Sequence, residues 1–117
     1  MRTVLQILYF SMLAFILYLA LSPEVSVIAG SANDKVNHLA AFFTLALFAR
    51  LLWPRANVLL PFIWLTALGA GIEVLQGVMD LGRDADWRDL MVNVAATVAG
   101  LMLAQGMLAT WREQRQK

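Results

Sequence analysis

The sequence predicts an all-α membrane protein, with four transmembrane helices in an antiparallel bundle and both termini in the cytoplasm. Hydrophobic residues make up 61% of the 117 residues and charged residues 15%, whereas soluble domains carry roughly 45–50% and about 25%. Four apolar runs are each close to the roughly 20 residues that a helix needs to cross a bilayer. We expect a single domain over residues 1–117, with helices at about 3–21, 36–53, 58–79 and 90–109.

The first two runs differ in their polar content. Residues 3–21 contain no charged residue. We expect this helix to be retained, because it is longer than the roughly 7–15-residue core of a signal peptide and no small-residue cleavage motif follows it. Residues 36–53 are interrupted by His38 and Arg50. Pro54 should end this helix, because proline lacks the amide hydrogen and clashes with the preceding turn.

The last two runs carry few polar groups. Residues 58–79 contain one charged residue, Glu73, and residues 90–109 contain none, although Asn93 and Gln105 are polar. The connection at 54–57 is so short that the second and third helices should be antiparallel neighbours. Tryptophans lie mostly near the ends of the runs, as interfacial anchors do; they are Trp53, Trp64, Trp87 and Trp111.

Small residues four apart suggest how the helices meet. Ala67 and Gly71 form such a pair in the third run, and Ala96, Gly100 and Ala104 continue the spacing in the fourth. This spacing forms a groove in which two helices approach closely in lipid. The pattern fits packing within one chain and fits a homodimer equally well.

The distribution of lysine and arginine predicts the orientation, because these residues are enriched in cytoplasmic loops. With four crossings, the basic residues on the side of the termini are Arg2, Arg50, Arg55, Arg112, Arg115 and Lys117. Those on the opposite side are Lys35, Arg83 and Arg88. We therefore expect a multi-pass protein of a bacterial cytoplasmic membrane, with the loops around 22–35 and 80–89 facing outward.

Composition excludes several other classes of protein. The net charge of +1 gives no general attraction to nucleic acid. The absence of cysteine excludes disulfides, thiolate metal sites and a cysteine nucleophile. A channel needs a polar path across the whole membrane, whereas the inner halves of the runs are almost wholly apolar.

Polar residues gather near the outward ends of the last three runs. A charged group within a membrane is costly, so one that is retained there is by default a candidate for a functional site. The candidate residues are Asp34, Lys35, His38, Glu73, Gln76, Arg83, Asp86, Asp89 and Asn93.

Each part of this set has a functional and a structural interpretation. Asp34 and His38 are four residues apart, so the carboxylate could orient the imidazole, or Asp34 could simply cap the helix. Glu73 lies about 10 Å inside the helix end. There it would take up a proton or pair with His38 or Arg83, and it could equally be a polar contact that holds the third and fourth helices together.

The last part of the set lies around the start of the fourth run. Asp86, Asp89 and Asn93 are spaced by three and four residues, so they follow one stripe of a helix. A solvated loop could carry the same acids. Asn93 argues for a site, because it continues the polar stripe into the depth of the membrane.

The order of these residues resembles the VanZ-like family of small bacterial membrane proteins. The matching elements are Asp34-Lys35-x-x-His38, Glu73-x-x-Gln76 and Arg83-x-x-Asp86-x-x-Asp89-x-x-x-Asn93. The family usually has a glycine three residues after the asparagine, where this chain has Ala96, and Gly100 stands where a second glycine is common. The resemblance implies a multi-helix protein of the cell envelope. The family's founding member is associated with resistance to the glycopeptide teicoplanin, and most relatives have no assigned activity.

We expect the polar residues to bind an amphiphile or a lipid headgroup, such as a lipid-linked precursor, a phospholipid or a lipoglycopeptide. Lys35 and Arg83 would contact its anionic group. Alternatively, the residues belong to a structural or accessory protein and only hold its helices together.

An enzyme acting on a headgroup is a third interpretation, and whether the protein is an enzyme stays open. His38, Glu73 and Asp89 could hold a divalent metal, or His38 or Glu73 could act as a general base. No catalytic motif supports this interpretation, so we expect no metal and no cofactor. The expected partners are the lipid bilayer, the amphiphile and a second copy of the chain.

Overall fold

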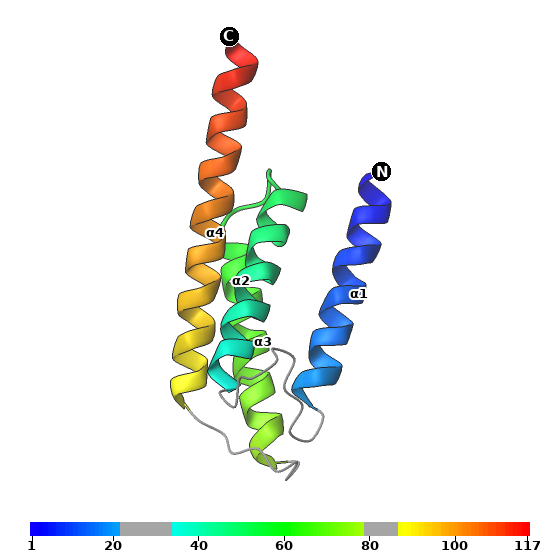
Figure 1. The fold of residues 1–117 in the computed structure, drawn as a ribbon, viewed down its shortest axis with the longest axis vertical. Helices are drawn as coiled ribbons and strands as arrows, with labels where there is room; N and C mark the ends of the chain where they lie inside the picture. The colour runs from blue at the N-terminus through cyan, green and yellow to red at the C-terminus, as the bar shows by residue number, and fades with distance from the viewer. Residues whose placement is uncertain (22–33, 79–86) are drawn as a thin grey trace.

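The computed structural model describes residues 1–21, 34–78 and 87–117, with the side chains of residues 34–37 excepted. Within this part the chain is all-helical. It forms α1 (Arg2–Ala20), α2 (Asp34–Leu52), α3 (Leu59–Val78) and α4 (Trp87–Gln116). α2, α3 and α4 lie together, α1 stands at their side, and both ends of the chain point to the same end of the bundle (Figure 1).

The helices begin and end within a few residues of the predicted runs, except at the end of α4. The fourth apolar run ends near residue 109, but α4 continues to Gln116. The extension contains good helix formers and neither glycine nor proline. Hydropathy identifies the part of a helix that is apolar enough to lie in lipid. It therefore does not detect the polar residues after 109, which are still helical.

The core is centred on α2, which contributes Phe42, Leu45, Ala46 and Ala49 as buried residues. α2 packs most extensively against α4 and also contacts α1 and α3. α1 buries only Tyr9 and Leu13. Three of the four helices therefore meet over a shared apolar core, and α1 covers one side of it.

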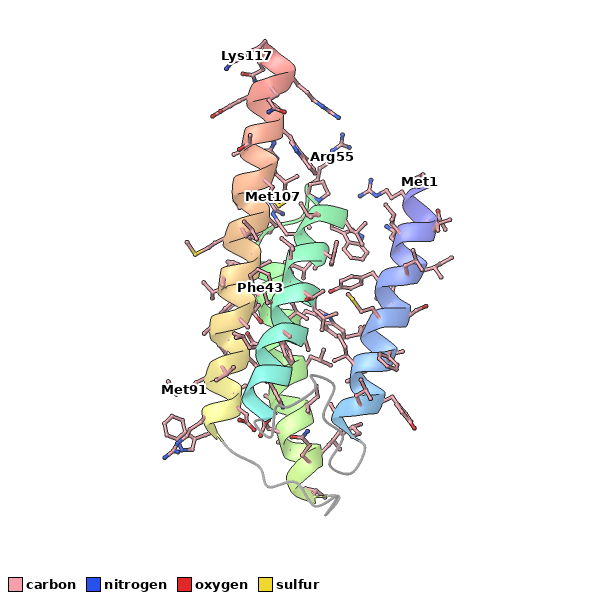
Figure 2. All side chains as sticks on the ribbon, in the orientation of Figure 1. Met1, Phe43, Arg55, Met91, Met107 and Lys117 are labelled. Atoms are coloured by element: carbon pink, nitrogen blue, oxygen red, sulfur yellow. The ribbon has the colours of Figure 1, made fainter. Side chains whose placement is uncertain are left out.

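Small residues of α4 allow the close approach of α2. A Cβ atom at Gly100 would lie 2.5 Å from the carbonyl oxygen of Phe43 and 2.9 Å from the Cβ atom of Ala46. Ala96 and Ala104, four residues to either side, are fully buried. The small-residue stripe of α4 thus packs within the chain, and Figure 2 shows Phe43 at this α2–α4 contact.

The corresponding small-residue pair in α3 does not pack against another described helix. Ala67 and Gly71 are exposed, and a Cβ atom at Gly71 would meet no described atom within 4 Å. The two stripes share one sequence pattern, but only the stripe of α4 faces another described helix. The pattern in α3 is left on the outer surface of the bundle.

Two hydrogen bonds fix the relative direction of α2 and α4. His38 contacts Asn93 near one end of the pair, and Arg50 contacts Gln105 near the other. Both contacts join residues 55 apart in the sequence. Because the separation is the same at both ends, α2 and α4 run side by side in the same direction.

Length and hydropathy show that α1, α3 and α4 could each cross a membrane. In α2 the apolar part of the described chain, His38–Leu52, is shorter. Large apolar side chains such as Phe15 and Ile63 are exposed on the outer faces of the helices, and Figure 2 shows side chains projecting outward along the bundle. An apolar exterior of this kind is typical of a protein that contacts lipid.

Candidate functional site

Four polar side chains from three helices lie together near the end of the bundle that is distant from the termini. They are His38 at the start of α2, Glu73 in the last part of α3, and Asp89 and Asn93 in the first two turns of α4. We call this group the polar cluster. Each residue is at most 7% exposed. The cluster therefore lies within the helix packing and not on the surface that would face lipid.

His38 is the link between the helices of the polar cluster. Its Nδ1 atom lies 2.9 Å from Oδ1 of Asn93 and 4.0 Å from Oε1 of Glu73. With the amide oxygen of Asn93 facing the ring, His38 donates the hydrogen bond from Nδ1. One turn further along α2, Phe42 stacks on the imidazole with the two rings 13° from parallel. These contacts hold the ring in a defined orientation.

Gly69 makes room for Asn93 between α3 and α4. A Cβ atom at residue 69 would lie 2.9 Å from Nδ2 of Asn93 and 3.4 Å from the ring of Phe42. Gly69 is one turn before Glu73, so both residues are on the face of α3 that carries the site. Gly69 is not among the residues predicted from the sequence. Its spacing of four from Glu73 was the only signal that could have indicated it.

The polar cluster contains the atoms that a metal site would need. One ligand atom from each of His38, Glu73 and Asp89 lies within 4.8 Å of the others. Imidazole and carboxylate together suit ions such as Zn²⁺ or Mn²⁺. An ion held at about 2.0–2.2 Å from its ligands separates them by at most about 4.4 Å. The limit of 4.8 Å is close to this span, and because Nδ1 of His38 contacts Asn93, Nε2 is the ring nitrogen that could bind an ion.

Gln76, another predicted site residue, has a different contact. It is 1% exposed, and its Nε2 atom donates a 2.7 Å hydrogen bond to the carbonyl oxygen of Ala20. Ala20 is the last residue of α1, where helix carbonyls lack partners within the helix. Gln76 therefore ties α3 to the end of α1.

The remaining predicted residues lie outside what the structure describes. This applies to Arg83 and Asp86, which fall in the segment 79–86, and to the side chains of Asp34 and Lys35. The backbone places Asp34 and Lys35 in the first turn of α2, one turn before His38. The placement of these four side chains relative to the polar cluster stays a prediction.

Arg50 is predicted from the sequence as an interruption of the second run and as a cytoplasmic charge, and in the structure it is buried. It is 7% exposed, and its Nε atom donates a 2.9 Å hydrogen bond to Oε1 of Gln105. Its Nη1 atom also donates to the carbonyl oxygens of Trp53 and Ala56. Arg50 thus joins α2, α4 and the connection between α2 and α3, at the opposite end from the polar cluster. Its partner Gln105 is too distant in sequence for spacing to reveal the pair.

Comparison of the chain with protein families, with curated proteins and with solved structures finds no match.

Proposed function

We propose that the chain is an integral membrane protein of the bacterial cell envelope, related to the VanZ-like family, with four antiparallel crossings and cytoplasmic termini. Two observations support the crossings. α2 and α4 run in the same direction, as alternate helices of such a bundle must. Trp87 and Trp111, both at least half exposed, are separated along α4 by about 36 Å. That distance brackets a hydrocarbon layer of about 30 Å.

The length of α2, 19 residues, is also compatible with this topology. α2 contacts α1, α3 and α4, so less of it would face lipid than in the other helices. Its polar start carries His38, which is covered by the packing of the polar cluster. A reporter fused after Lys117 should read cytoplasmic, and a periplasmic reading would invert the proposed orientation.

We infer that the polar cluster binds the polar headgroup of an amphiphile at the outer face of this membrane. The observation that carries the inference is the convergence of His38, Glu73 and Asp89 with Asn93 between three apolar helices. Ionisable groups at such a position are costly and are retained mainly for function. Carboxylates accept hydrogen bonds from hydroxyl and amine groups, and Asn93 adds an amide.

Basic residues close in sequence to the polar cluster would supply the opposite charge. Lys35 precedes His38 by three residues, and Arg83 precedes Trp87, the first residue of α4, by four. Arginine is suited to phosphate through its forked donors. A headgroup with a phosphate and with hydroxyl or amine groups would use both kinds of residue. Lipid-linked precursors, phospholipids and lipoglycopeptides contain such headgroups.

A binding experiment with the purified chain tests this inference. Lipid-linked precursor, phospholipid and lipoglycopeptide are titrated into the protein in detergent, and bound ligand is measured by native mass spectrometry. Glu73→Gln keeps the shape of the side chain and removes its charge, so affinity should fall about tenfold or more. Glu113→Gln is the matched control, because Glu113 is an exposed acid near the other end of α4. Unchanged affinity in both Glu73→Gln and Arg83→Ala would end the proposal.

A structural role is the second candidate, and the 2.9 Å contact between His38 and Asn93 favours it. In this case the cluster fixes how α2, α3 and α4 pack and binds nothing. The two functions differ in how stability and phenotype respond to substitution. Replacing cluster residues one at a time by alanine should lower stability and envelope-antibiotic tolerance together if the role is structural. A site for a ligand would lose the phenotype while most of the stability remains.

A further inference from the structure

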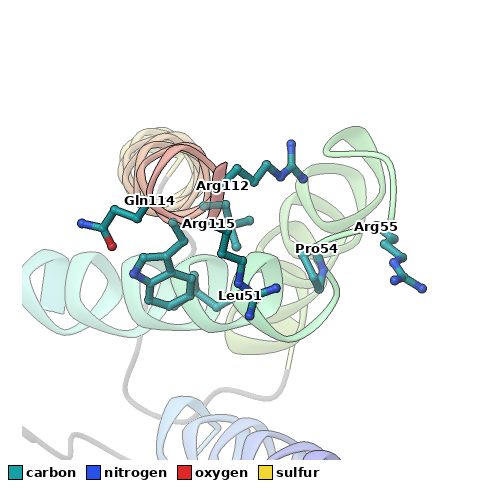
Figure 3. Close-up of a pocket in the computed structure, with 8 residues that line it drawn as sticks. Leu51, Pro54, Arg55, Arg112, Gln114 and Arg115 are labelled. Atoms are coloured by element: carbon teal, nitrogen blue, oxygen red, sulfur yellow. The ribbon is translucent and has the colours of Figure 1, made fainter. Parts of the chain in front are cut away.

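A second binding surface lies at the opposite end of the molecule, next to the chain termini. A groove of about 550 Å³ runs between the last turns of α4 and the end of α2 with its following turn. Its lining includes three arginines, Arg55, Arg112 and Arg115, and the apolar side chains of Leu51, Leu108 and Trp111. In Figure 3, Arg115 is directed toward Leu51 and Pro54, and Arg55 lies on the far side of Pro54.

Four of the five α4 residues that line this arginine groove follow one helical stripe. Leu108, Trp111, Arg112 and Arg115 follow one another at intervals of three, one and three residues, so they share one face of the helix. Along this stripe the side chains change from a buried leucine to a half-exposed tryptophan and then to exposed arginines. The groove is therefore apolar at one end and cationic at the other.

The three arginines differ from Arg2 and Arg50, which lie near the same end and have hydrogen-bond partners. Arg2 donates to the carbonyl oxygen of Leu52, and Arg50 donates to Gln105. Within the described part of the chain, no hydrogen bond or ion pair involves any of the three groove arginines, and no acidic side chain lines the groove. Three like charges around one groove favour the binding of an anion.

The position of the groove specifies the kind of anion. It begins at Leu108, where the apolar run of α4 ends, which places it at the boundary between hydrocarbon and water. Basic pockets between membrane helices on the cytoplasmic side suit anionic phospholipid headgroups. An inorganic anion would use the arginines but would leave the apolar half of the groove without a ligand.

We propose that the arginine groove binds the phosphate headgroup of an anionic phospholipid, with the start of its acyl chains against Leu108 and Trp111. Arg112 and Arg115 contact the phosphate through forked hydrogen bonds, and Arg55 adds charge from the other wall. This site is independent of the polar cluster and of the amphiphile proposed to bind there. It requires only that this end of α4 lies at the membrane surface.

The test uses the full chain in detergent, titrated separately with phosphatidylglycerol, cardiolipin, phosphatidylcholine and inorganic phosphate. Bound lipid is counted by native mass spectrometry. The anionic lipids should bind at least about tenfold more tightly than phosphatidylcholine, and more weakly as salt is raised. Arg112→Gln and Arg115→Gln should each lose about tenfold in affinity. Lys117→Gln is the matched control, because it removes one exposed charge from the same end outside the groove lining.

Several outcomes would overturn the proposal. One is equal affinity for phosphatidylcholine and phosphatidylglycerol. Another is a loss in Lys117→Gln as large as in the groove variants, which would show a diffuse charge effect. Competition by millimolar inorganic phosphate as effective as that of the lipid would show a simple anion site. Helix content is measured for every variant, and Arg112→Lys, which keeps the charge, separates loss of the forked contact from misfolding.

Discussion

The close contact at Gly100 predicts that adding a single methyl group there destabilises the protein. In Gly100→Ala the new Cβ atom would start 2.5 Å from the carbonyl oxygen of Phe43, which belongs to the backbone of α2. A normal C···O contact is about 3.3 Å or longer, so the two helices must separate by roughly 0.8 Å. Such a gap loses a quarter to a half of the dispersion energy of the facing atoms.

The separation would also strain the polar contacts on either side. The distances from His38 to Asn93 and from Arg50 to Gln105 are both 2.9 Å, and neither hydrogen bond survives an extension of that size. Overpacking costs about 1–3 kcal/mol and each lost hydrogen bond about 0.5–1.5 kcal/mol. We therefore expect the free energy of unfolding to fall by about 2–6 kcal/mol.

The measurement is unfolding of the purified protein by SDS in detergent, followed by circular dichroism. Gly106→Ala is the control on the same helix, because a Cβ atom at Gly106 meets no described atom within 4 Å. Alanine is the better helix former, so Gly106→Ala should be neutral or more stable by up to about 1 kcal/mol. Equal stability of the two variants would refute the close packing of α2 on α4.

Three further predictions concern the polar contacts. In Asn93→Leu, His38 loses this hydrogen-bond partner, so the free energy of unfolding should fall by about 1–3 kcal/mol in the same SDS titration; an unchanged value would contradict the contact. A double-mutant cycle of Arg50→Met and Gln105→Leu should give a coupling energy of about 1–2 kcal/mol, and independent effects would show that the pair does not interact. Elemental analysis of the dialysed protein should find less than one Zn²⁺ or Mn²⁺ per chain, because the sequence contains no recognised metal-binding motif; one ion per chain that disappears in Glu73→Gln would show that the polar cluster holds a metal.

The helices could be predicted because each depends on a local property of the chain. An apolar run of about 20 residues can be recognised locally, and Pro54 stands two residues after Leu52, the last residue of α2. The presence of His38, Glu73 and Asn93 at one end of the bundle could also be anticipated. Successive crossings alternate in direction, so the start of the second and fourth runs and the end of the third run lie on the same side. This prediction needs no knowledge of how the helices pack.

The contacts that hold the bundle together could not be predicted in the same way. Ala67 with Gly71 and Ala96 with Gly100 have identical spacing, yet only the second pair faces α2. The difference depends on the surface that a partner helix offers, which the sequence of one helix does not contain. Arg50 shows the same limit, because its buried environment is created by Gln105 and by backbone carbonyls from the following turn.

The arrangement of these contacts implies that α2 and α4 form the rigid part of the molecule. A shift of one turn between them would break the polar contacts at both ends and bring a larger side chain against Phe43 in place of Gly100. The Gly100 contact lies between the two hydrogen bonds, so the register is fixed at three points. A ligand at the polar cluster would therefore meet a prepared surface on these two helices.

α1 is attached in a different way, and any conformational response should be concentrated there. It buries two residues, and within the described part of the chain three hydrogen bonds to backbone carbonyls join it to α2 and α3. Arg2 donates to Leu52, Tyr9 donates to Leu45, and Gln76 donates to Ala20. Leu52 and Ala20 end their helices, so their carbonyls lack partners within the helix and accept these bonds without disturbing it. Because Gln76 is one turn from Glu73, a ligand that moves the end of α3 would release or tighten α1 and leave the α2–α4 pair in place.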